Sequence, residues 1–330
     1  MTTATAGPPM ATSEQANWFA RAFGALVTNV EQAVLGKQHI VRLALTCLVS
    51  EGHLLLEDYP GTGKTSLAKA IANSVQGSHS RIQFTPDLLP SDVTGVTIYD
   101  QRSSQFSFHG GPIFATIVLA DEINRASPKT QSALLEVMEE NRVTVDGTPH
   151  PVGRPFMVIA TQNPIEQAGT YRLPEAQLDR FLMKTSLGYP DHASTVALLA
   201  SAATRDRSAS VQNVITTSAI TQMSRLADQV HVDPSILGYV SQLAHESRQL
   251  RQVRLGVSVR GCLAYVRAAK TWALADGRGY VVPDDVKELA IPVLSHRVLL
   301  DAEAEFSGVS VEDVIGQLLS RVRPPTSRGE

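Results

Sequence analysis

The nine residues EDYPGTGKT, at positions 57–65, constrain the fold of this chain more than any other stretch. They follow an apolar run at 54–56 and precede SLAKAIANSV, whose apolar residues recur at helical spacing. A strand, a Gly-rich turn and a helix start predict a phosphate-binding loop, because the N–H groups of the turn and of the helix N-terminus attract an anion. The stretch therefore predicts an α/β fold with a phosphate site at the end of this strand.

The residues of the loop have separate expected tasks. Gly61 and Gly63 let the backbone approach an anion without a Cβ in the way. Lys64 can reach the β and γ phosphates, and the Thr65 hydroxyl can ligate Mg²⁺. The pattern G-x-x-x-x-G-K-[ST] asks for Gly at position 58, where this chain has Asp. Asp tolerates unusual backbone angles better than most residues, so we expect the departure to be tolerated.

Length and composition indicate a soluble globular protein with room for two domains. The chain has 330 residues, 43% of them hydrophobic and 18% charged, against about 100–200 residues for an ordinary domain. A formal net charge of -3 leaves no electrostatic footprint for nucleic acid, so a nucleic-acid partner is not expected.

Cellular location is predicted from the cysteines and the apolar segments. Cys47 and Cys262 lie far apart in apolar helical contexts, which favours reduced core thiols and a cytoplasmic location. The first residues lack the basic start and apolar centre of a signal peptide, and the longest apolar runs are too short for a membrane span.

A second informative stretch is ATIVLADEINRASPKTQSALLEVMEE. Its short apolar strand at 117–120 ends in Asp121 and Glu122, and the carboxyl ends of such strands line the crevice where open α/β sheets bind ligands. We expect Asp121 to hold the Mg²⁺ shell and Glu122 to take a proton from an attacking water. An Asp-Glu pair is common by chance, so its significance comes from the phosphate loop upstream. Arg125, close after this pair, could face a neighbouring site or be a surface charge, and we favour the surface charge.

Two further polar residues follow predicted strands or helices. Asn163 comes just after the strand at 156–160, where an amide can bond both a γ phosphate and the attacking water, although an Asn there is often only a turn residue. Arg180 lies near the end of the short helical segment LPEAQLDRF, and spacing alone assigns it no catalytic role.

Composition divides the chain near residue 190. Before it, apolar strands alternate with helical segments, and after it helical spacings dominate. Within the first part, the polar DQRSSQ predicts an insert at about 93–108, and Asp146-Gly147 predicts a hairpin at about 142–156. The predicted parts are a disordered tail at 1–13, an α/β nucleotide-binding domain at 14–190, a helical domain at 191–322 and a loose tail at 323–330.

Five segments together resemble the AAA+ ATPases, and within them the MoxR family. They are GHLLLEDYPGTGKTSLAKA, RIQFTPDLLPSD, GPIFATIVLADEINRASPKTQSALLEVMEE, VIATQNPIEQAGTYRLPEAQLDRF and GVSVRG. They occur in the family's order over about residues 30–300. The resemblance implies a parallel-sheet P-loop ATPase domain followed by a smaller all-helical lid domain. Two departures are Asp58 and Val259, which stands where the family often has Pro before the lid arginine.

The resemblance also implies roles for individual residues. The nucleotide would be bound by the adenine-lining segment and the Walker A loop, with Asp121 of Walker B: Val34, Leu35, Gly36, Pro60, Gly61, Thr62, Gly63, Lys64, Thr65, Ser66 and Asp121. Thr65 and Asp121 would ligate Mg²⁺. The catalytic set would be Lys64, Glu122, Asn163 as sensor 1, Arg260 as sensor 2 in the lid and Arg180 as an arginine finger that reaches into the neighbouring subunit's site.

The function implied by the resemblance is hydrolysis of Mg-ATP in a ring, expected to be a hexamer. Such a ring would act as a chaperone-like remodeller that assists maturation or metal or cofactor insertion in client complexes, with a partner carrying a von Willebrand factor A domain. The chain itself specifies neither client nor partner.

Three other functions share part of the pattern. A nucleic-acid motor is disfavoured by the acidic balance and by the lack of an appended basic domain. A small-molecule kinase shares the phosphate loop but leaves Glu122, Asn163 and Arg260 unexplained. A nucleotide-gated scaffold that binds ATP and hydrolyses little of it is also compatible with the sequence.

Overall fold

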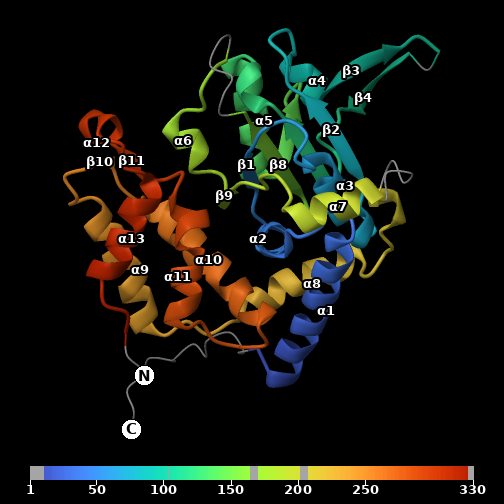
Figure 1. The fold of residues 1–330 in the computed structure, drawn as a ribbon. Coiled ribbons are helices and arrows are strands. Elements are labelled where there is room, and N and C mark those ends of the chain that lie inside the picture. The colour runs from blue at the N-terminus through green and yellow to red at the C-terminus, as the bar shows by residue number, and fades with distance from the viewer. Residues whose placement is uncertain (1–10, 103, 164–169, 201–206, 326–330) are drawn as a thin grey trace, which may run out of the picture. The chain divides into compact units, whose positions relative to one another are not determined.

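The computed structural model describes residues 11–102, 104–163, 170–200 and 207–325 (Figure 1). Its contacts divide the chain into two compact units. One unit is Ala25–Thr221, and the other joins the described residues up to Gly24 with those from Gln222 onward. Helices α1 (Ser13–Glu31) and α8 (Thr217–Asp228) each contribute residues to both units. Most of the two predicted tails, 1–13 and 323–330, lies outside the described residues.

The division differs from the boundary predicted near residue 190, because the segment that follows packs on the α/β part. The Asn73 side chain donates to the carbonyl of Ser208 at 2.8 Å. The backbone N–H groups of Val214 and Ile215 donate to the carbonyl of Ser74 at 2.9 and 3.1 Å. Helical composition after residue 190 therefore does not coincide with a change of compact unit.

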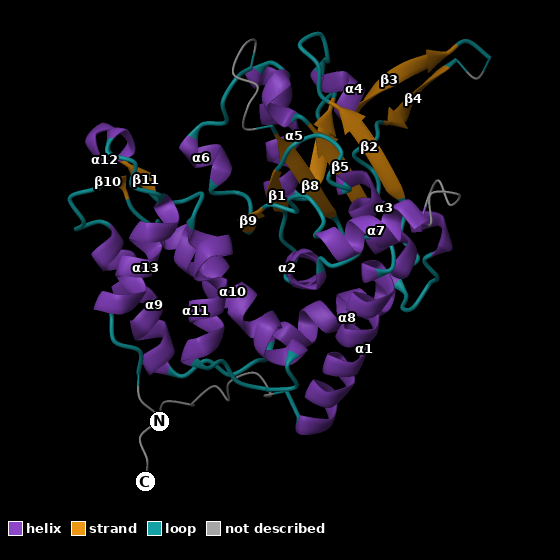
Figure 2. Ribbon diagram, in the orientation of Figure 1, coloured by secondary structure: helices purple, strands orange, loops and turns teal. Residues whose placement is uncertain are grey.

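A five-stranded parallel sheet forms the centre of the first unit (Figure 2). The strands, in spatial order, are β2 (His79–Gln83), β5 (Ile117–Asp121), β8 (Met157–Gln162), β1 (Leu54–Glu57) and β9 (Met183–Thr185). The apolar runs of β1, β5 and β8 are typical of strands buried on both faces. Because all strands are parallel, their carboxyl ends meet at one edge of the sheet.

Helices cover this sheet. Those of the unit, besides α1 and α8, are α2 (Gln38–Val49), α3 (Lys64–Ser74), α4 (Pro90–Thr94), α5 (Pro128–Glu140), α6 (Glu175–Leu178) and α7 (His192–Ala200), with the 3-10 turns η1 (Ile123–Arg125) and η2 (Arg207–Ser210). On one face, Leu55 and Val158 belong to the same buried cluster as Leu134 and Met138 of α5. The alternation of strand side chains turns Leu54 and Leu56 of β1 to the opposite face.

Two hairpins occur where the sequence predicts an insert and a hairpin. They are β3 (Gly95–Asp100) with β4 (Gln105–Gly110), and β6 (Arg142–Val145) with β7 (Thr148–Pro151). The turn at Asp146 and Gly147 has positive φ at both residues, 50° and 76°, as expected for a two-residue hairpin turn. Phe108 of β4 stacks on His150 of β7, with ring centroids 3.8 Å apart.

The second unit is mainly helical. Its helices are α9 (Pro234–Ser247), α10 (Val259–Ala275), α11 (Pro283–Leu294), α12 (Ala302–Phe306) and α13 (Val311–Arg321). The all-helical prediction missed a two-stranded antiparallel ribbon, β10 (Val253–Leu255) with β11 (Leu299–Leu300). Strands of two or three residues are too short to produce an alternating pattern. None of the helices in the described ranges is both long and apolar enough to cross a membrane.

Asp285 holds the start of α11 in this unit. Its carboxylate is 3% exposed and accepts two hydrogen bonds from Arg278, at 2.6 and 2.7 Å. It also accepts the backbone N–H of Val282 at 2.8 Å. The hydrogen bond to Asp285 raises the pKa of the Arg278 guanidinium above its ordinary value. One carboxylate thus serves as helix cap and as partner of a bidentate arginine.

We therefore predict that Asp285→Ala destabilises this unit by about 2 kcal/mol, through loss of the cap and the charge-assisted bonds. The readout is tryptophan fluorescence during urea unfolding, because both tryptophans, Trp18 and Trp272, lie in this unit. The matched control is Asp284→Ala, whose side chain is 86% exposed and pairs with Lys287 on the surface. Equal effects of the two substitutions would contradict the role assigned to Asp285.

Candidate nucleotide-binding site

The loop between β1 and α3 has the backbone shape of an anion cradle. Gly61 and Gly63 have φ angles of +82° and +96°, in the left-handed region that favours glycine. No heavy atom lies within 4 Å of the place where a Cβ would stand on either residue. The glycines are therefore required by the turn and leave open space beside it. Gly63 directly precedes α3, so the N-terminus of that helix faces the loop.

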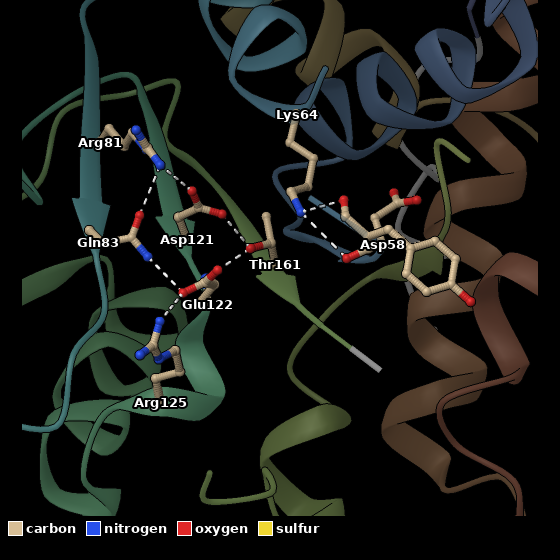
Figure 3. Close-up of polar contacts among 9 residues, drawn as sticks. Asp58, Lys64, Arg81, Gln83, Asp121, Glu122, Arg125 and Thr161 are labelled. Atoms are coloured by element: carbon tan, nitrogen blue, oxygen red, sulfur yellow. Dashed lines mark hydrogen bonds and ion pairs between the residues drawn. The ribbon is translucent and has the colours of Figure 1, made fainter. Parts of the chain in front are cut away.

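Lys64 crosses the loop. Its Nζ donates to the carbonyl of Tyr59 at 3.2 Å and lies 3.5 Å from the carbonyl of Asp58 (Figure 3). The Thr62 hydroxyl donates to the same Tyr59 carbonyl at 3.3 Å. Thr65 and Ser66 follow in the first turn of α3. An ammonium held by neutral carbonyls can turn to a phosphate, which is a stronger acceptor.

Asp58 has a different role from the one predicted. Its φ is not among the positive ones, so tolerance of unusual backbone angles does not explain it. The side chain is 2% exposed, and its oxygens accept from the Ser186 hydroxyl at 2.9 Å and the backbone N–H groups of Leu187 and Gly188 at 2.6 and 2.8 Å. The residue is a buried carboxylate that ties the loop to the segment after β9.

Asp121 is fixed through both of its carboxylate oxygens. Oδ1 accepts from the Thr161 hydroxyl at 2.7 Å, and Oδ2 pairs with Nη2 of Arg81 at 2.5 Å (Figure 3). The side chain of Asp121 is mostly buried, whereas that of Arg81 is half exposed. Thr161 thus orients the carboxylate, and Arg81 supplies a positive charge next to it.

Glu122 occupies a strained position beside Asp121. Its backbone is left-handed, with φ 58° and ψ 49°, which is costly for a residue with a side chain. Its N–H donates to the Thr161 hydroxyl at 2.8 Å. Its Oε2 accepts from the Gln83 amide at 3.0 Å and from Nη1 of Arg125 at 2.9 Å. Arg125 is therefore a partner of Glu122 rather than only a surface charge.

Sequence reasoning missed the functional contacts of Arg81, Gln83 and Thr161. Arg81 and Gln83 are two residues apart on β2, so they share one face of the strand. Their relevance depends on the register that pairs Gln83 with Asp121. Thr161 depends likewise on the pairing of β8 with β5. The alternation of polar and apolar residues in RIQFT indicates that Arg81 and Gln83 share a face. It does not indicate which strand pairs with β2.

The remaining predicted residues lie in several places. Asn163 directly follows β8, the strand between β5 and β1, and is 9% exposed. Residues 164–169 after it lie outside the described residues. Arg180, two residues past α6, donates from Nη1 to the carbonyl of Leu135 at 2.6 Å and pairs through Nη2 with Glu139 at 3.0 Å. Both bonds attach its guanidinium to α5.

The predicted adenine segment follows α1. Val34 is buried, Leu35 is half-buried, and Gly36 has a positive φ of 70°. A Cβ on Gly36 would lie 2.5 Å from the Ser194 hydroxyl, so this segment approaches the start of α7 closely. Pro60, by contrast, is exposed at the rim of the phosphate loop.

Arg260 belongs to the second unit, in the first turn of α10, where it is exposed. The Ser258 hydroxyl caps this helix by accepting the N–H of Gly261 at 2.9 Å. Val259 therefore replaces Pro without loss of a capped helix start.

These residues fit Mg-ATP. A hydroxyl at Thr65 and a carboxylate at Asp121 are the oxygen ligands that Mg²⁺ accepts, and the glycine cradle leaves open space for phosphates. Arg81 holds one oxygen of Asp121, so metal binding at that oxygen requires Arg81 to share it or withdraw.

Comparison with known proteins gives consistent matches. A family model for the ATPase family associated with various cellular activities (AAA) matches residues 53–183, and one for the AAA lid domain matches residues 245–318. YeaC of Bacillus subtilis (strain 168) is 46% identical over 305 residues, 92% of this chain and 95% of YeaC. Chaperone MoxR1 of Mycobacterium tuberculosis is 39% identical over 308 residues, 91% of this chain and 81% of MoxR1. A crystal structure from Cytophaga hutchinsonii has a TM-score of 0.88 at 35% identity, covering 95% of this chain and 98% of that chain. The predicted fold, an AAA-type α/β domain followed by a helical lid domain, is confirmed.

From the site geometry we predict that Thr161→Val lowers turnover of Mg-ATP about 10-fold or more, because both bonds of the hydroxyl to the acidic pair are lost. Binding of ADP without Mg²⁺ should change little, since the phosphate loop is untouched. The control is Thr161→Ser, which retains the hydroxyl and should retain most of the turnover. A Val variant as active as the Ser variant would contradict the positioning role.

Proposed function

This chain belongs to the MoxR family of AAA ATPases, and we propose that it hydrolyses Mg-ATP at the carboxyl edge of its parallel sheet. One observation carries the proposal. The consecutive strands β5, β8 and β1 deliver the acidic pair, Asn163 and the phosphate loop to the same edge. That set is what in-line attack of water on a γ phosphate requires.

In the proposed reaction, each residue has one task. Lys64 leaves the loop carbonyls and neutralises phosphate charge, and Glu122 accepts the proton of the attacking water. Asn163 orients that water. Thr65 and Asp121 would hold Mg²⁺, which would supply charge neutralisation at the phosphates. Positioning and electrostatics provide most of the rate.

Two arginines complete the proposed site. Arg260 is assigned to the lid of the same subunit and Arg180 to the site of the next subunit, on the basis of the family motifs. To reach that site, Arg180 would release the Leu135 carbonyl and Glu139 and bind a phosphate of the nucleotide held by the neighbouring subunit. A heterologous contact of this kind forms a ring when the rotation between neighbouring subunits closes, and we propose a ring of six subunits, a hexamer.

The proposed cellular role is that of a chaperone-like remodeller. Its relative MoxR1 is described as a chaperone. We propose that the ring couples ATP turnover to maturation, or metal or cofactor insertion, in client complexes, together with a partner that carries a von Willebrand factor A domain. The client is to be identified by experiment.

A second candidate, a nucleotide-gated scaffold with little hydrolysis, is favoured by one contact set. Oε2 of Glu122 already accepts from Gln83 and Arg125, which competes with binding of a water. A scaffold would keep these bonds when ATP is bound.

Glu122→Gln decides between the two candidates. For an ATPase, we predict that phosphate release falls about 10²–10⁴-fold, because an amide cannot accept the proton, while ATP stays bound. Single-turnover phosphate release and ATP retention on the protein are the measurements. Glu140→Gln, an exposed acid paired with Arg142, is the matched control. Turnover that is low in the parent chain and unchanged in Glu122→Gln would support the scaffold instead.

Arg180→Ala tests the shared site. We predict a loss of about 10³-fold or more in turnover, as for other arginine fingers, with ATP affinity nearly retained. Per-subunit turnover of the unsubstituted chain should rise with protein concentration and then level. Glu139→Gln is the control, because it removes the ion pair on α5 but keeps the guanidinium. The shared site is excluded if assembled Arg180→Ala turns over ATP normally.

A further inference from the structure

Asp58 stands where the phosphate-loop pattern has glycine, and its side chain has partners outside the loop. The carboxylate is buried and accepts three hydrogen bonds from the segment that follows β9. Burial of a carboxylate is costly unless its oxygens are satisfied. Here one hydroxyl and two backbone N–H groups satisfy them, in charge-assisted bonds that are stronger than neutral ones. A glycine would leave all three donors without this acceptor.

We call residues 186–189, between β9 and α7, the strap. A second contact joins the strap to the phosphate loop. The ring of Tyr59 stacks on that of Tyr189, with centroids 6.0 Å apart and planes 7° from parallel. The strap also contacts Lys37, whose ammonium donates to the carbonyl of Tyr189 at 2.8 Å. The strap is therefore attached both to the phosphate loop and to the segment at 36–37.

The loop residues that hold the strap are also the residues that hold Lys64. The Lys64 ammonium contacts the carbonyls of Asp58 and Tyr59. The side chains of the same two residues contact the strap. If Lys64 turned to a phosphate, both carbonyls would lose this cation. The side chains of Asp58 and Tyr59 would then connect that change to the strap.

We propose that Asp58 is a positioning residue that couples nucleotide occupancy of the phosphate loop to the order of the strap. This coupling rests on the proposed function only in requiring that a nucleotide binds the loop. Coupling of this kind is reciprocal, so an ordered strap must strengthen nucleotide binding by the same factor. If Asp58 had only a structural role, it would stabilise the fold, and the order of the strap would not change when a nucleotide binds.

The test uses the full-length chain with ADP, so that hydrolysis plays no part. ADP affinity is measured by calorimetry, and amide hydrogen exchange is measured over the strap, where the Leu187 and Gly188 amides are the donors to Asp58. In the unsubstituted chain, ADP should slow exchange of the strap. In Asp58→Gly, which restores the pattern residue, we predict about 10-fold weaker ADP binding and a strap whose exchange no longer responds to ADP.

A glycine variant that binds ADP as tightly as the parent chain, or a strap that still responds to ADP in that variant, would overturn the coupling. Ser186→Ala removes one of the three bonds without touching the loop and should shift both readouts in the same direction by less. If Asp58→Gly does not fold, Ser186→Ala decides by the same readouts, and unchanged values overturn the coupling. A parent chain that binds no ADP would instead overturn the proposed function. A parent chain that binds ADP without any change in the amide exchange of the strap would overturn the coupling alone.

Discussion

Burial of strand β1 inside the parallel sheet, between β8 and β9, is the constraint on which the candidate site depends. Its three leucines, at 54–56, are completely buried, and it pairs with β8 on one side and β9 on the other. Pairing on both sides fixes the register as well as the direction of the strand. The loop that follows must therefore start at the carboxyl edge of the sheet, where β5 and β8 deliver Asp121 and Thr161.

Features that depend on neighbouring residues could be predicted from the sequence. Gly61 and Gly63 are needed by a turn of a few residues, and the predicted strand before Asp121 is an uninterrupted apolar run. In each case the cause lies within one turn or one strand, so the residues of that turn or strand are enough to predict the feature.

Features that depend on distant segments could not be predicted. Asp58 and the Ser186 hydroxyl are 128 positions apart, and Arg81 and Asp121 are 40 apart. These pairs meet only because the sheet brings their strands together. The acidic pair is thereby held by a continuous set of bonds that runs from Asp121 through Arg81 and Gln83 to Glu122 (Figure 3). Because Arg81 and Gln83 lie on β2 and bond the acidic pair, this strand is part of the candidate site.

A site shared between subunits is tested most directly by combining two inactive variants, Glu122→Gln and Arg180→Ala, in one assembly. Glu122→Gln lacks the base but keeps Arg180. Arg180→Ala keeps the base but lacks the arginine. Co-expression in equal amounts should restore about a quarter of the parent turnover, because random assembly gives that share of interfaces an intact base and a neighbour's intact arginine. A mixed assembly no more active than either variant alone would contradict the shared site.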